Sequence, residues 1–184
     1  MMTTLDGFPV PVGVAGPDKG VVVVILGDAQ RAPAAYDAVC ERLHTASLRT
    51  VVVGLDPRLT PKSVVGILDA LGIGWAVVVG DRAGADLAWE LAATKLGRFT
   101  GLVVIDRGHP RAPDPNGVIR DEHCPPVEIG TTMLVSSPGG RSVARNSQRF
   151  VYAEYRTVDL LGRRNAQEST AQLAAEIVLR ASTW

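Results

Sequence analysis

The sequence lacks the features that would place it in several common classes of protein. Its two cysteines, Cys40 and Cys124, have no C-x-x-C spacing, so neither a disulfide framework nor a zinc motif is indicated. The most apolar run, residues 21–26, is too short to span a bilayer, and the amino terminus has no basic segment followed by a long apolar one. We therefore expect a cytoplasmic protein without a membrane partner.

An excess of charge of one sign is also lacking. The 19 lysine and arginine residues balance 19 aspartate and glutamate residues, and neither sign forms a long block. This argues against the basic surface that a nucleic-acid partner requires. Residues 26–30, after the first expected strand, contain one glycine, so the glycine-rich phosphate-binding motifs are missing. We expect neither a nucleic-acid partner nor a cofactor.

The chain does have the composition and periodicity of a single globular domain, which we expect to span residues 1–184. Valine-rich runs that alternate with stretches of helical period predict a doubly wound α/β fold with a mostly parallel six-stranded sheet. Strands are expected near 21–26, 50–55, 76–80, 101–106, 131–136 and 153–160. Helices are expected near 33–47, 61–72, 83–96 and 166–181.

Two segments depart from this alternation. Residues 1–19 are rich in proline and glycine, which predicts an irregular arm or one poor edge strand. Residues 107–130 contain five prolines and an Asp-Pro-Asn-Gly turn at 114–117. A long connection of this kind within one domain predicts a lid or a binding loop.

The expected strand at 76–80 leads directly into Gly80-Asp81-Arg82-Ala83-Gly84 and then into a helix. A strand, a sharp turn and a helix form the context of a nucleophile elbow, in which flanking glycines allow close approach of the backbone. With the succession of segments at 21–28, 51–58, 69–80 and 88–106, the chain resembles the α/β-hydrolase superfamily from residue 21 to its end. The resemblance implies a reduced α/β-hydrolase fold, with strand order 4-3-5-6-7-8 in the family's numbering and a short lid at 107–130.

The chemistry of that family requires a nucleophile, a histidine and a carboxylate. Arg82 stands at the nucleophile position, where a guanidinium offers only donors and cannot attack. The resemblance places Arg163 at the histidine position, and the loop at 137–145, where the acid is expected, has no carboxylate. Only Asp106, one strand earlier, could take the place of the acid. We therefore expect no hydrolysis by the family's mechanism and a catalytically degenerate protein.

The resemblance also implies that Arg82 lies at the floor of a pocket beside a helix amino terminus, which favours an anion. Arg163 and Arg141, on the loops after the last two strands, should converge on the same sheet edge. The predicted site for a small anionic ligand consists of Asp28, Ala29, Arg82, Ala83, Asp106 and Arg163. In the alternative interpretation, Arg82 pairs with Asp106, Asp28 or Asp81 and fills a disused pocket.

Further alternatives remain open from the sequence. Asp106 and His109 could activate water as an acid–base pair in an unconventional hydrolase. The chain could instead bind a protein partner or form a homo-oligomer through a lid or edge strand, with Trp184 as an exposed anchor. Residues 121–124 combine possible metal ligands, but adjacent residues cannot all turn toward one ion, so we predict no metal site.

Overall fold

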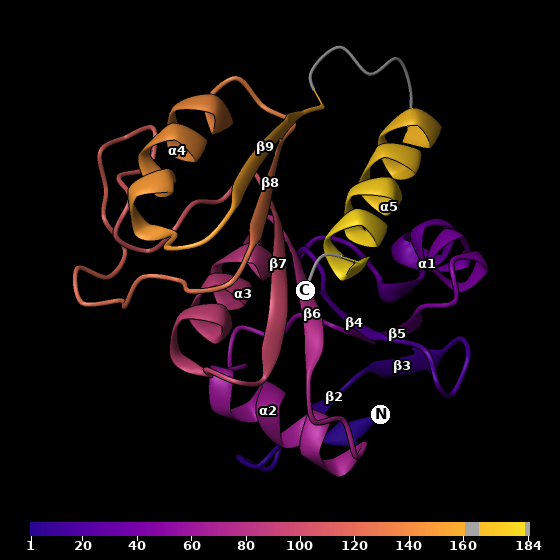
Figure 1. The fold of residues 1–184 in the computed structure, drawn as a ribbon. Coiled ribbons are helices and arrows are strands. Elements are labelled where there is room, and N and C mark those ends of the chain that lie inside the picture. Colours follow the sequence, from indigo (N-terminus) through magenta and orange to yellow (C-terminus); the bar gives the residue numbers. More distant parts are fainter. Residues whose placement is uncertain (161–165, 183–184) are drawn as a thin grey trace.

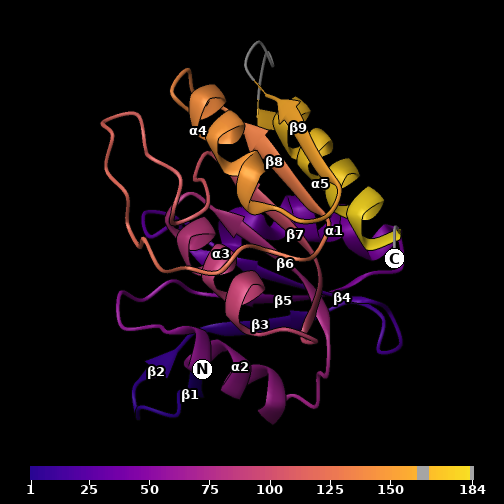
Figure 2. The ribbon, with the colours of Figure 1, turned by 60° about the vertical axis from the view of Figure 1, so that its left-hand side comes forward.

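A seven-stranded sheet forms the centre of the protein (Figures 1 and 2). The computed structural model describes residues 1–160 and 166–182. The strands are β3 (Val12–Ala15), β4 (Val22–Leu26), β5 (Arg49–Val53), β6 (Ala76–Asp81), β7 (Phe99–Ile105), β8 (Thr131–Val135) and β9 (Tyr155–Asp159). Their order is β3-β5-β4-β6-β7-β8-β9, and all neighbours are parallel except β3 and β5. The six predicted strands are thus present in the predicted order.

Helices cover both faces of this sheet (Figure 1). The faces differ in their helices: α2 (Pro61–Ala70), α3 (Ala83–Thr94) and α4 (Gly140–Ser147) pack on one, and α1 (Asp37–Thr45) and α5 (Ala166–Ser182) on the other. A 3-10 turn at Pro33–Tyr36 precedes α1. Successive strand residues alternate between the two cores, as Val23 and Val24 do, because strand side chains have a period of two. Burial on both faces explains why the strands are continuous valine-rich runs.

The amino-terminal arm adds structure that the sequence indicated only weakly. β1 (Met2–Thr3) and β2 (Pro9–Val10) form a small antiparallel pair, and β3 extends the main sheet. β3 lies antiparallel to β5, with Val12 opposite Val53. β3 is one strand more than the six predicted, and it covers the edge that β5 would otherwise leave open.

The segment after β8 corrects the sequence-based expectation of a plain loop. Gly140–Ser147 forms α4, and Gln148–Phe150 continues as a 3-10 turn. The Ser137-Pro-Gly-Gly start is typical of a turn, and the helix that follows offers few apolar residues to reveal its period. α4 buries Val143 and Ala144 in the core on its face of the sheet.

The connection from β7 to β8, residues 107–130, contains no regular helix or strand. It is nevertheless anchored, because Ala112 and Cys124 are buried and Val127 bridges Val151. Within the two described ranges, no helix is both long and apolar enough to cross a membrane.

We predict that Gly84→Ala strongly destabilises the fold. A Cβ at residue 84 would lie 2.6 Å from the carbonyl oxygen of Gly27 and would also meet that of Leu26, so α3 could not keep its distance from β4. Overpacking of this kind costs about 3 kcal/mol. Denaturant titration should show the loss, whereas the control Gly13→Ala, whose Cβ would meet nothing within 4 Å, should stay close to wild type.

Candidate functional site

The turn between β6 and α3 has the geometry of the elbow that the sequence predicts. β6 ends at Asp81, α3 begins at Ala83, and Arg82 between them has φ 50° and ψ −105°. A residue other than glycine is strained at this backbone geometry. A Cβ at Gly80 would lie 2.7 Å from the amide nitrogen of Ala85, so that glycine is required for the approach of α3 to β6.

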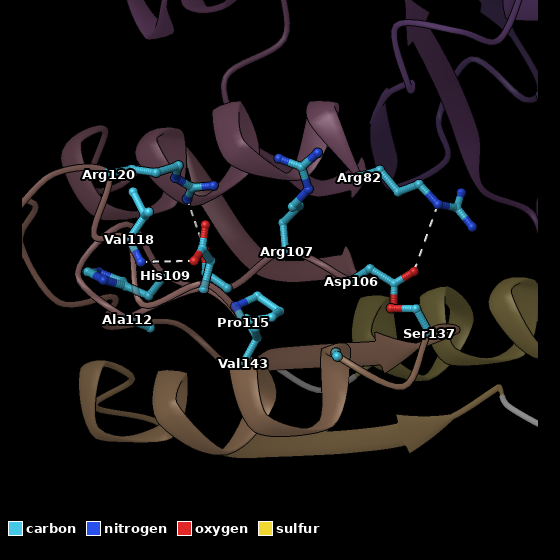
Figure 3. A pocket seen from close by; sticks show the side chains of 14 residues that line it. Arg82, Asp106, Arg107, His109, Ala112, Pro115, Val118, Arg120, Ser137 and Val143 are labelled. Atoms are coloured by element: carbon cyan, nitrogen blue, oxygen red, sulfur yellow. Dashed lines mark hydrogen bonds and ion pairs between the residues drawn. The ribbon is translucent and has the colours of Figure 1, made fainter.

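Arg82 is held by acceptors on three strand ends. Its Nη1 donates to Asp81 Oδ1 at 2.8 Å, and its Nη2 donates to Ser136 Oγ at 3.2 Å. Its Nε lies 3.8 Å from Asp106 Oδ2 (Figure 3). Two of the three carboxylates that were expected as alternative partners therefore contact the guanidinium. The side chain is 34% exposed, so this is a partly buried ion pair.

Behind Arg82, Asp81 continues the network into the core. Its buried Oδ2 accepts a hydrogen bond from the Tyr36 hydroxyl at 2.8 Å, and that hydroxyl accepts the backbone N–H of Asp28 at 2.7 Å. Burial raises the pKa of Tyr36, which keeps the phenol protonated as a donor. The resemblance to hydrolases compares residues 21–28 with the strand that leads into the family's oxyanion loop, and the amide of Asp28 in this segment is occupied by Tyr36.

Asp106 ends β7 on the other side of the elbow. Its Oδ1 accepts the backbone N–H of Ser136 at 2.7 Å, and its Oδ2 accepts the Ser136 hydroxyl. Its backbone has a positive φ of 63°. The carboxylate that could replace a catalytic acid is therefore oriented toward Ser136 and Arg82, and no histidine among the described residues contacts it.

His109 is buried, and its ring nitrogens are both occupied. Nδ1 accepts the backbone N–H of Arg111 at 3.1 Å, so Nε2 carries the proton and donates to the carbonyl of Pro125 at 2.7 Å. Its ring stacks on Phe150 at 4.9 Å between centroids. This geometry corrects the expectation that Asp106 and His109 activate water, because the ring has no free lone pair to accept a proton.

A cavity of about 440 Å³ opens beside Arg82, between residues 106–120 and the start of α4; we call it the site cavity. Figure 3 shows Arg82, Asp106 and Ser137 at one end and Arg120, His109 and Ala112 at the other. The remaining lining residues are Arg107, Gly108, Asp114, Pro115, Val118, Gly139, Gly140 and Val143.

Two further arginines on the cavity wall share one carboxylate. Arg107 Nη1 donates to Asp86 Oδ2 at 2.9 Å, and Arg120 forms an ion pair with Asp86 Oδ1. Arg120 Nη2 also donates to the carbonyl of Gly108 at 2.9 Å. Burial lowers the pKa of Arg120, so this guanidinium is poorly solvated and gains from a nearby anion.

The predicted ligand set is only partly brought together. Arg82 and Asp106 line the site cavity, but Ala29 and Ala83 line a separate groove of about 330 Å³ that also exposes Asp86 and Glu90. Arg141 pairs with Asp159 on the outer side of the sheet edge instead of converging on the site. Arg163 and Trp184 lie outside the described residues.

The sequence reasoning missed Tyr36, Arg120 and Ser136 as members of this region. Tyr36 and Ser136 approach Arg82 only through tertiary contacts, and no motif marks them. A signal for Arg120 was available, since the proline-rich segment has several arginines. Among the described residues no group of three metal-ligating side chains occurs, and the buried Cys124 directs its thiol at the carbonyl of Pro125.

Comparison with known proteins identifies the fold. The sequence matches no protein-family model and no curated protein. The structure is similar to epoxide hydrolase A from Mycobacterium thermoresistibile, with a TM-score of 0.74 and 12% identity over 93% of this chain and 94% of that chain. It is also similar to MGS-M2, an α/β-hydrolase enzyme from a Medee basin deep-sea metagenome library (TM-score 0.75, 13% identity, 95% and 94% covered). An α/β-hydrolase from Sphaerobacter thermophilus gives a TM-score of 0.69 at 18% identity, with 97% and 98% covered. The chain therefore has the α/β-hydrolase fold.

We predict that Arg82→Met lowers the free energy of unfolding by about 2 kcal/mol. Removal of Arg82 leaves the buried carboxylate of Asp81 with only the more distant guanidinium of Arg31, at 4.0 Å, and the partial exposure of Arg82 keeps the cost below that of a fully buried pair. Arg141→Met is the matched control, because the Arg141–Asp159 pair is exposed and should contribute about 0.5 kcal/mol or less. Equal losses in the two variants would show that the Arg82 network does not stabilise the fold.

We also predict that His109 makes stability depend on pH. Burial holds the pKa of His109 below its ordinary value, so the unfolded chain takes up a proton near pH 6.5 that the folded chain does not bind. Stability is therefore lost as the pH falls through about 6.5. Urea denaturation between neutral and mildly acidic pH should show a smaller loss in His109→Gln, which keeps His44 and His123. An unchanged slope in that variant would assign the pH dependence to other groups.

Proposed function

We propose that this chain is a non-hydrolytic protein of the α/β-hydrolase fold that binds a small anionic ligand in the site cavity. The first half of the proposal rests on the elbow. Arg82 cannot attack a carbonyl group, and its guanidinium is engaged by Asp81, Asp106 and Ser136. Tyr36 takes the amide of Asp28 that an oxyanion would need. The elbow keeps its strained backbone, but its side chain belongs to a structural ion-pair network.

The observation that carries the binding proposal is the convergence of arginines and a helix amino terminus on one cavity. Gly139 and Gly140, at the start of α4, line the site cavity. The N–H of Gly140 donates to the carbonyl of Ser137 at 3.1 Å, and the first turn of α4 has no acidic residue. The first N–H groups of a helix lack partners within the helix and carry partial positive charge, which favours an anion.

The charges on the cavity wall support the same ligand class. Asp106 is already engaged with Ser136 and Arg82, and Asp114 Oδ1 accepts the backbone N–H groups of Asn116 and Val118 at 2.8 and 2.9 Å. Arg107 and Arg120, in contrast, have only Asp86 between them as an ion-pair partner among the described residues. A carboxylate or phosphate group would supply the second negative charge.

The size and the apolar part of the wall describe the rest of the ligand. Cavities of about 300 to 1,000 Å³ are typical of small-molecule sites, and the site cavity falls within that range. Pro115, Val118 and Val143 contribute apolar surface to it. We therefore propose a compact organic acid or phosphate ester whose apolar part contacts these side chains.

A thermal-shift comparison tests binding with acetate, benzoate, succinate, inorganic phosphate and phenyl phosphate, and with benzylamine as the cationic counterpart. At a concentration of about 100 times Kd, a ligand stabilises the folded state by about 2.7 kcal/mol. We expect at least one acid to raise the Tm of the wild type and of Arg42→Met, a control on the exposed surface of α1. The same acid should not raise the Tm of Arg120→Met.

Two results would contradict the proposal. If no acid raises the Tm, or if an acid raises the Tm of Arg120→Met and of the wild type equally, the proposed anion binding is wrong. For the other half, we expect neither the wild type nor Arg82→Ser to hydrolyse p-nitrophenyl acetate above the rate of a heat-denatured sample. Turnover that disappears in Asp106→Asn would instead establish a hydrolase.

A further inference from the structure

A second surface lies at the edge of the sheet where β9 borders α4 (Figure 1). A groove of about 360 Å³ runs between the two elements. Arg141, Arg145 and Gln148 line it from the helix side, and Tyr155 and Thr157 line it from the strand. We call it the α4–β9 groove.

The strand side of this groove is the outer edge of β9, with which no other strand of the described residues pairs. β9 is the last strand of the sheet, and its one strand partner in the described part of the chain is β8. The carbonyl of Glu154 and the N–H of Leu160 bond toward β8, at 2.9 and 2.7 Å. Because backbone direction alternates along a strand, the N–H and C=O groups of Tyr155 and Thr157 point the other way, toward the open edge. Such an edge can accept another strand.

The helix side of the groove is basic. Residues 140–150 contain three arginines, Arg141, Arg145 and Arg149, and no acidic residue. The three arginines are four residues apart and all exposed, so they form a row along α4 and the turn that follows it. Arg141 and Arg145 line the groove itself, whereas the guanidinium of Arg149 lies over the Phe150 ring, 5.2 Å from its centre. Asp159 pairs with Arg141, but neither Arg145 nor Arg149 forms an ion pair with any described residue. The row therefore carries excess positive charge beside the open strand edge.

We propose that the α4–β9 groove binds an extended acidic peptide, which adds a strand to β9 and directs every second side chain at the arginine row. The side chains of alternate strand residues share one face, so acidic residues at every second position would all lie on the α4 side. Backbone hydrogen bonds to Tyr155 and Thr157 would fix the register, and Arg145 would select the charge. The proposal is independent of ligand binding in the site cavity.

A second copy of this chain fits the edge less well. Antiparallel pairing of two β9 strands in one continuous sheet places α4 of both copies on the same face of that sheet. The two arginine rows would then lie side by side, and like charges in this arrangement repel. A nucleic acid would satisfy the arginines but would leave the strand edge unused.

The experiment measures fluorescence polarisation of a labelled hexapeptide of alternating glutamate and valine. We expect binding in the micromolar range, weakened at least about tenfold in Arg145→Glu and in Thr157→Pro. Proline at residue 157 removes an N–H that points to the open edge and leaves the bonds to β8 in place. Arg42→Glu, on α1, changes the net charge by the same amount as Arg145→Glu and should bind the peptide as the wild type does.

A peptide methylated on the alternate amide nitrogens that face β9 tests the same hydrogen bonds without changing the protein, and we expect it not to bind. The proposal is overturned if the glutamate peptide shows no binding up to about 1 mM, the weakest affinity of interest here. It is also overturned if the methylated peptide, a lysine-containing peptide or oligodeoxythymidine binds equally well. Sedimentation that shows a dimer in wild type but not in Thr157→Pro would assign the edge to a second copy instead.

Discussion

The ion-pair network around Arg82 is the interaction that holds together the strand ends at the candidate site. Asp81, Arg82, Asp106 and Ser136 lie at the carboxyl ends of adjacent parallel strands, so one guanidinium joins β6, β7 and β8. Buried carboxylates at such an edge require a counter-charge. Arg82, at the centre of the elbow, supplies this counter-charge. The elbow thus has a strained backbone at Arg82, and the side chain of the same residue forms ion pairs.

The backbone of the elbow and the side chain that it carries can be considered separately. The scaffold of the elbow is intact, because Gly80 and Gly84 allow α3 to pack closely on β6 and β4. Beside the elbow, Tyr36 occupies the amide of Asp28, and His109 anchors the 107–130 segment between Pro125 and Phe150. The cavity beside the elbow has Arg82, Arg107 and Arg120 on its wall, and the proposed anion binding rests on these side chains.

The expected site and the observed one differ for a physical reason. The resemblance to hydrolases placed every functional group around the elbow, including Arg163 and the oxyanion loop. In the structure, the positive charge on the cavity wall comes instead from Arg107 and Arg120, in a segment without regular secondary structure. The direction of side chains in such a segment depends on tertiary hydrogen bonds, such as that from Arg120 to Gly108, and no periodicity in the sequence encodes them.

The sequence by itself determined the alternation of strands and helices, the doubly wound parallel sheet and the glycine spacing of the elbow, because valine-rich runs, helical period and glycine spacing are local properties of the chain; the strand order followed from the resemblance to hydrolases. It did not reveal α4, whose few apolar residues hide its period, and it indicated β3 only as a poor strand. Only the tertiary structure decided that Arg82 pairs with Asp81 and Asp106, that His109 has no free ring nitrogen, and that β9 is left with an open edge beside an arginine row. These features depend on contacts between residues far apart in the chain. Packing and electrostatics decide which of several possible partners meet, and the sequence does not distinguish between these partners.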